Sequence, residues 1–154
     1  MKMNLKNKES YNDEELKTVF EQYKLYVEMT DRVSQRRMSA NTFFTTINTL
    51  LLSVATFAGS KELPWVIFIG TIGCAISFVW YFTINSYRQL NAGKFAIINK
   101  IEELLPLSLY LYERESLESG KKKSKYWPLS HVEKIIPVIF FFVYITLIVF
   151  LVFF

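Results

Sequence analysis

The chain has 154 residues, of which 51% are hydrophobic and 17% aromatic, with a formal net charge of +4 and one cysteine. A single cysteine excludes an intramolecular disulfide and a thiolate metal cluster within one chain. The charges lie in blocks: only Lys61 and Glu62 are charged in 42–85, and no residue is charged in 135–154. Such stretches exceed the roughly 18 apolar residues that mark a membrane-spanning candidate. We therefore expect an all-α membrane protein with three transmembrane helices and a cytoplasmic amphipathic helical hairpin.

Residues 1–40 are expected to form a cytoplasmic N-terminal helical segment. Apolar residues recur at helical spacing from Leu16 to Val27, and three acidic residues follow Asn12. Asn12 suits an N-cap, and acidic side chains are stabilising in a first helical turn. Arg36 and Arg37, toward the end of this segment, are candidates for contact with anionic lipid headgroups.

The first span is predicted at 42–60 and is polar for a lipid-facing helix. Its polar residues follow steps of 3, 1, 4 and 3, which predicts one shared face: Thr45, Asn48, Thr49, Ser53 and Thr56. Two interpretations stay open. The face forms hydrogen bonds between helices, or several copies of it line an aqueous path. The second interpretation requires an oligomer, since two or three spans cannot enclose a pore alone.

The second span is predicted at 64–85, with Trp65 at one end and Trp80 near the other as markers of the headgroup levels. Small residues within it form two overlapping pairs at a spacing of four, which favours close helix packing: Gly70 with Cys74, and Gly73 with Ser77.

A cytoplasmic helix and basic linker are predicted at 86–132, with helical periodicity to Glu118 interrupted or kinked by Pro106. The linker is rich in lysine, and two compatible roles are open for it, binding of anionic lipid and enforcement of the topology: Lys121, Lys122, Lys123 and Lys125. The third span is predicted at 135–154, facing lipid, with Pro137 in its first turn, where proline is tolerated.

The positive charges predict the orientation. Eight Lys and Arg precede the first span, one lies between the first two spans, and nine lie between the second and third. Lys and Arg accumulate on the cytoplasmic side of membrane proteins. We therefore expect the N-terminus and the middle segment in the cytoplasm.

Catalytic chemistry is poorly supported. His131 is the only histidine, the five glycines are scattered, and no phosphate-binding loop or metalloprotease motif is present. Glu102 and Glu103 are adjacent, hence about 100° apart on a helix, and we expect them on a solvated face rather than in a paired-carboxylate site. No catalytic residue, cofactor, metal or nucleic-acid partner is expected.

The chain resembles known families. Seven short stretches are distinctive: Ser34-Gln35-Arg36-Arg37, Asn41 to Phe44, Asn48-Thr49, Trp80, Ser86 to Asn91, Lys94-Phe95 and Glu102 to Pro106. Together they resemble the RipA family of small bacterial inner-membrane proteins, over roughly residues 10 to 112. Members of that family are described as octameric. The order of an N-terminal helix, two spans and a long helix is also similar to SLATT domains, which are proposed as membrane-perturbing effectors in bacterial conflict systems.

The resemblance implies a homo-oligomer of the bacterial inner membrane. The basic residues named above predict anionic lipids of the cytoplasmic leaflet as partners. The expected function is a non-enzymatic scaffold or channel-like assembly, with the first span or the Gly70 to Ser77 face at the subunit contact. The alternative is a SLATT-like pore-forming effector of an anti-phage system, gated by an unidentified regulatory protein.

Overall fold

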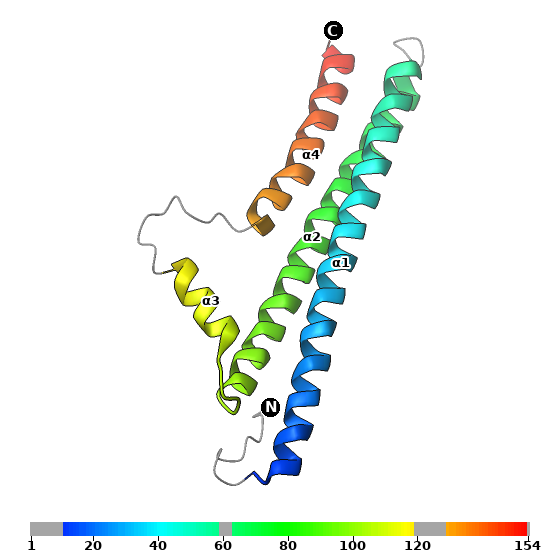
Figure 1. The fold of residues 1–154 in the computed structure, drawn as a ribbon. Coiled ribbons are helices and arrows are strands. Elements are labelled where there is room, and N and C mark those ends of the chain that lie inside the picture. The colour runs from blue at the N-terminus through cyan, green and yellow to red at the C-terminus, as the bar shows by residue number, and fades with distance from the viewer. Residues whose placement is uncertain (1–10, 59–62, 119–128, 154) are drawn as a thin grey trace. The chain divides into compact units, whose positions relative to one another are not determined.

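A computed structural model describes residues 11–58, 63–118 and 129–153. All regular structure in these residues is helical, as predicted (Figure 1). The helices are α1 (Asp13–Ala58), α2 (Leu63–Glu102), α3 (Leu109–Glu118) and α4 (Leu129–Phe153). The predicted lipid-binding lysines at 121–125 lie outside the described residues.

The start of α1 is fixed by a reciprocal cap. The backbone N–H of Glu15 donates to Asn12 Oδ1 at 2.7 Å, and the N–H of Asn12 donates to Glu15 Oε2 at 3.1 Å. Each bond satisfies a backbone donor that has no partner within the helix. The predicted N-cap at Asn12 is confirmed.

The helices are longer than the predicted segments. α1 runs unbroken between the predicted N-terminal segment and the predicted first span, and α2 continues past residue 85 to Glu102. The chain then turns, with Pro106 in the break, and α3 begins at Leu109. Proline has no backbone N–H and clashes with the preceding helical turn, so the predicted interruption at Pro106 is confirmed.

Pro137 corrects one prediction. It was expected in a first helical turn, but α4 begins at Leu129, so Pro137 lies inside the helix. Because proline cannot donate a backbone hydrogen bond, the carbonyl of Glu133 lacks its usual partner within the helix. Pro137 is fully buried.

The fold divides into two compact units. The described part of unit 1 comprises residues 11–33 and 90–118, and that of unit 2 comprises 34–58, 63–89 and 129–153. Unit 1 has an apolar core from α1, α2 and the turn that follows α2, formed by Val33, Ile98, Ile101 and Leu104.

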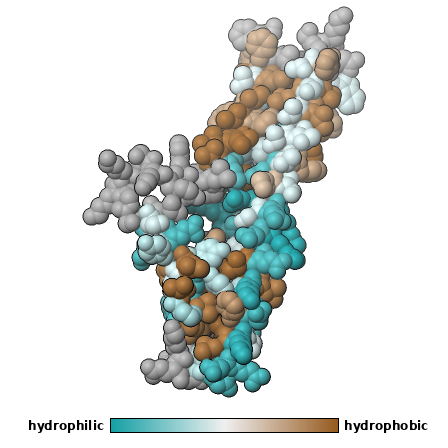
Figure 2. All heavy atoms as spheres, in the orientation of Figure 1, coloured by the Kyte–Doolittle hydropathy of each residue, from teal (hydrophilic) through white to brown (hydrophobic). Residues whose placement is uncertain are grey.

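Unit 2 packs three helices together. Its buried apolar cluster joins α1, α2 and α4 and is formed by Leu51, Ala55, Val66, Ile69 and Leu147. Around it, much of the apolar surface is exposed, with side chains such as Phe82 and Phe142 more than half accessible. In Figure 2 the outer surface of α4 is brown, beside a paler run along α1. Apolar side chains facing outward suit lipid rather than water.

Two helices of the described residues are long and apolar enough to cross a membrane. They are Pro64–Glu102, within α2, and Val132–Phe150, within α4. α1 is not one of them, because its C-terminal half carries the predicted polar face. Crossing of the membrane by residues 42–60 therefore stays a prediction.

Candidate functional site

Asn48 is the point at which the three helices of unit 2 meet. Its side chain is fully buried and its Nδ2 donates to the Phe44 carbonyl at 2.8 Å. Its Oδ1 accepts a hydrogen bond from Ser77 Oγ of α2 at 3.2 Å, and its backbone carbonyl accepts one from the Tyr144 hydroxyl of α4 at 2.9 Å. Buried polar groups are costly unless bonded, so these bonds select one arrangement of the three helices.

Asn41 repeats this role two turns earlier on α1. The indole N–H of Trp80 donates to Asn41 Oδ1 at 2.9 Å. The Trp80 side chain is 1% exposed and stacks on Phe44, with ring centroids 5.8 Å apart and planes inclined by 12°. Trp80 was expected to mark a headgroup level, and the structure adds that it joins α1 to α2.

The remaining members of the predicted polar face point outward. Thr45, Thr49 and Thr56 are exposed and Ser53 is half-buried. Each hydroxyl donates to a backbone carbonyl three or four residues earlier, at 2.8–2.9 Å. Two further exposed hydroxyls on the same side form similar bonds. We call this set the hydroxyl stripe: Thr42, Thr45, Thr46, Thr49, Ser53 and Thr56.

The small residues of α2 lie beneath α4. A Cβ atom added to Gly70 would lie 2.8 Å from Ile148 Cγ1, and one added to Gly73 would overlap the Tyr144 ring. Cys74 is half-buried, with its Sγ 3.9 Å from the carbonyl of Phe141. Ser77, the fourth residue of this set, contacts Asn48. This face is therefore covered by other helices of the same chain.

The charged residues of the described part of unit 2 gather at one end. Arg37 Nε lies 3.4 Å from Glu133 Oε2, and both side chains are mostly buried, at 17% and 15% exposed. Lys134 Nζ donates to Asn85 Oδ1 at 2.7 Å. Arg36, the other arginine expected at lipid headgroups, is exposed. Sequence reasoning had no signal for the Arg37–Glu133 pair, because its partners are far apart in the chain.

Glu102, in unit 1, corrects a second prediction. It was expected on a solvated face, but its side chain is fully buried. Its carboxylate accepts hydrogen bonds from the Tyr23 hydroxyl at 2.9 Å and from the backbone N–H groups of Tyr110 and Leu111 at 3.0 and 3.3 Å. A carboxylate at a helix N-terminus accepts hydrogen bonds from N–H groups that have no partner within the helix, and its negative charge interacts favourably with the helix dipole. Glu102 thus fixes α3 against α1 and α2.

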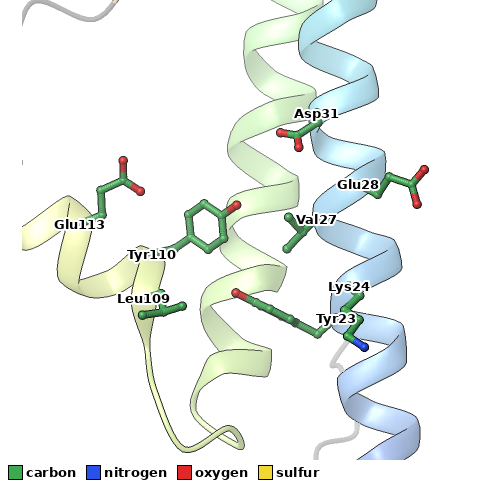
Figure 3. Close-up of a pocket in the computed structure, with 8 residues that line it drawn as sticks. All are labelled: Tyr23, Lys24, Val27, Glu28, Asp31, Leu109, Tyr110 and Glu113. Atoms are coloured by element: carbon green, nitrogen blue, oxygen red, sulfur yellow. The ribbon is translucent and has the colours of Figure 1, made fainter.

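A pocket of about 500 Å³ in unit 1 is lined by Tyr23 and Tyr110, which both donate hydrogen bonds to Glu102 (Figure 3). Burial and the hydrogen bond to Glu102 raise the pKa of Tyr23 above its ordinary value. Burial and the charges of Asp31, Glu113 and Glu102 raise the pKa of Tyr110. Both tyrosines therefore keep their protons at neutral pH. The lining consists of Tyr23, Lys24, Val27, Glu28, Asp31, Leu109, Tyr110 and Glu113.

The described residues contain no cluster of metal-ligating side chains. Within 11–58, 63–118 and 129–153, no three His, Cys, Asp or Glu side chains gather as a metal site would require. Glu102 is occupied in capping α3, and Glu103 is exposed.

Two long apolar helices, with polar groups hydrogen-bonded between them and a third helix, are typical of an α-helical integral membrane protein. The chain belongs to the octameric membrane protein family (8xMP), which it matches over residues 20–153. The expected likeness to an octameric family is thereby confirmed, and the match extends through α4, beyond the residues that suggested it. No curated protein and no solved structure matches the chain.

Proposed function

We propose that this chain is a subunit of a non-enzymatic homo-octamer of the bacterial inner membrane, acting as a scaffold or channel-like assembly. Family membership supports the octamer. The distribution of Lys and Arg supports a cytoplasmic N-terminus and middle segment. The predicted first span, 42–60, is the third membrane crossing of this proposal beside α2 and α4, because α1 packs on these two apolar helices from Asn41 to Ala55.

The hydroxyl stripe carries the proposal. The outer surface of α4 is apolar and suits lipid, whereas the outer surface of α1 presents six small hydroxyl-bearing side chains. Because each hydroxyl proton is already donated to the backbone, the stripe can contact another protein surface without leaving an unsatisfied donor. Small and hydroxyl-bearing residues are enriched where membrane helices contact each other. We therefore assign the stripe to the face between subunits or around the octamer axis.

Native mass spectrometry of the detergent-extracted chain tests the assembly. We expect an octamer for the natural sequence and smaller species for the double variant Thr45→Leu, Thr49→Leu, which enlarges two adjacent positions of the stripe. Val79→Leu is the matched control, because Val79 is exposed on the outer face of α2, and it should stay octameric. A monomer for the natural sequence would contradict the proposal.

The second candidate is a partner-gated pore of the effector type. The same stripe favours it, since threonine hydroxyl oxygens facing an octamer axis could line a water-filled path. If the assembly conducts ions, expression of the natural sequence should lower the membrane potential, and expression of Thr49→Leu should leave it unchanged. An unchanged potential at equal expression would favour the scaffold. Asn48→Leu is less suitable for this test, because Asn48 is buried within unit 2 rather than exposed.

A further inference from the structure

The charged end of unit 2 has more cations than its own carboxylate can neutralise. Its described residues include four Lys and Arg side chains and one carboxylate, that of Glu133. Glu133 is paired with Arg37 in a mostly buried contact. Three cations therefore have no carboxylate partner among the described residues: Arg36, Arg88 and Lys134.

Lys134 is held in a defined place. Its Nζ lies 2.7 Å from Asn85 Oδ1 and 5.7 Å from the centroid of the Tyr81 ring, and its side chain is half-buried. An ammonium group has three N–H donors. One is used by Asn85, so the others remain for an anionic ligand at a fixed position.

Arg88 lies next to this arrangement on α2. Tyr81, Asn85 and Arg88 follow steps of four and three, so they share one face of the helix. Asn85, in the middle of that face, contacts Lys134 of α4. Arg88 is exposed and its five donors match the oxygens of a phosphate group. Two cations from two helices thus border the edge along which α2 and α4 meet.

We propose that Lys134 and Arg88, positioned by Asn85 and Tyr81, bind the phosphate of an anionic phospholipid. The proposal rests on the membrane orientation given above, which puts this end at the cytoplasmic headgroup level. The occupant is a lipid rather than free phosphate, because one turn deeper the edge is apolar and exposed at Phe78 and Val138. Acyl chains would lie there.

Lipid binding to the intact octamer tests the site. The natural sequence in detergent is titrated with phosphatidylglycerol or phosphatidylcholine, and bound lipid is counted by native mass spectrometry. We expect a preference for phosphatidylglycerol, and about a tenfold loss of its affinity in Lys134→Gln and in Arg88→Gln, as for charge-assisted hydrogen bonds. Lys100→Gln is the matched control: it removes the same charge at an exposed position of unit 1 and should weaken binding by about twofold or less, since it acts through screened long-range attraction.

Asn85→Ala distinguishes a binding site of defined geometry from diffuse electrostatic attraction, because the substitution changes no charge. Loss of the positioning contact should lower phosphatidylglycerol affinity several-fold in a species that is still octameric. The proposal is overturned if Lys134→Gln, Arg88→Gln and Lys100→Gln weaken binding equally, or if both lipids bind alike. It is also overturned if only Lys134→Gln acts while Arg88→Gln and Asn85→Ala do not. A natural sequence that is not octameric would contradict the proposed function instead.

Discussion

Two sets of polar side chains in this protein satisfy their hydrogen-bonding groups in different ways. Asn41, Asn48 and Glu102 point inward and are hydrogen-bonded to other helices. The hydroxyl stripe points outward and is hydrogen-bonded to its own helix. The inward set determines which helices pack together, because its members are satisfied in one arrangement only. Among the described residues, the hydroxyls of the outward set form no hydrogen bond to another helix, so this face remains available to a second copy.

The largest effect should come from removing an inward carboxylate. Glu102→Ala leaves the Tyr23 hydroxyl and two backbone N–H groups of α3 without their acceptor. We expect a loss of about 3 kcal/mol in the free energy of unfolding, since hydrogen bonds to charged groups are involved. Hydrogen–deuterium exchange should show α3 losing protection first. Glu103→Ala, at an exposed position, is the control, and equal effects of the two variants would contradict the inward role of Glu102.

The second-largest loss of stability is expected at the close contact between Gly73 of α2 and the Tyr144 ring of α4. In Gly73→Ala the new Cβ would overlap the Tyr144 ring, whose hydroxyl bonds to the Asn48 carbonyl. Overpacking of this kind should cost about 2 kcal/mol, measured by unfolding in mixed micelles. Gly93→Ala is matched in chemistry and has open space around it. It should be neutral or stabilising by up to about 1 kcal/mol, because alanine favours the helix over glycine. An equal loss in Gly93→Ala would contradict the assignment of the cost to the contact with Tyr144.

A smaller loss is expected for Asn48→Leu. The substitution removes the acceptor of Ser77 Oγ but leaves the Asn48 carbonyl that binds Tyr144. Ser77 can turn to its own backbone, so the cost should be about 1 kcal/mol, in the range of polar contacts between membrane helices. If the variant were as stable as the natural sequence, the contact would not help to fix the packing of α1 on α2.

The smallest effect on the fold is expected in the hydroxyl stripe. Thr49→Ala removes a hydroxyl that bonds only to the Thr45 carbonyl. The free energy of unfolding of the dissociated subunit should change by less than about 0.5 kcal/mol, as for exposed positions, while the octamer is weakened. A loss as large as that of Asn48→Leu in the dissociated subunit would remove the distinction between the two sets.

The sequence predicted the helical class, the break at Pro106 and the N-cap at Asn12, because each depends on neighbouring residues. It placed Asn48 and Thr49 on one face, since the 100° step between adjacent residues lets both belong to one broad polar surface. Only the packing of α2 and α4 against α1 makes Asn48 buried and leaves Thr49 exposed. A usable signal was present: Asn41 and Asn48 are seven residues apart, a spacing that keeps two side chains on nearly the same side of a helix.

Glu102 could not be predicted as buried for a similar reason. Its charge and its neighbour Glu103 favour a solvated face, and its partners come from a helix nearly eighty residues earlier and from α3. The residues next to Glu102 in the sequence include neither of these partners. The turn at Pro106 brings the start of α3 back to Glu102, and that return depends on tertiary structure rather than on helix periodicity.

Disulfide cross-linking in membranes tests most directly whether the hydroxyl stripe faces neighbouring subunits. In a Cys74→Ser background, cysteine is placed at Thr49, or at Val79 on the exposed outer face of α2 at a similar level. Oxidation should yield cross-linked dimers for Thr49→Cys and monomers for Val79→Cys. Dimers from Val79→Cys and none from Thr49→Cys would contradict the account.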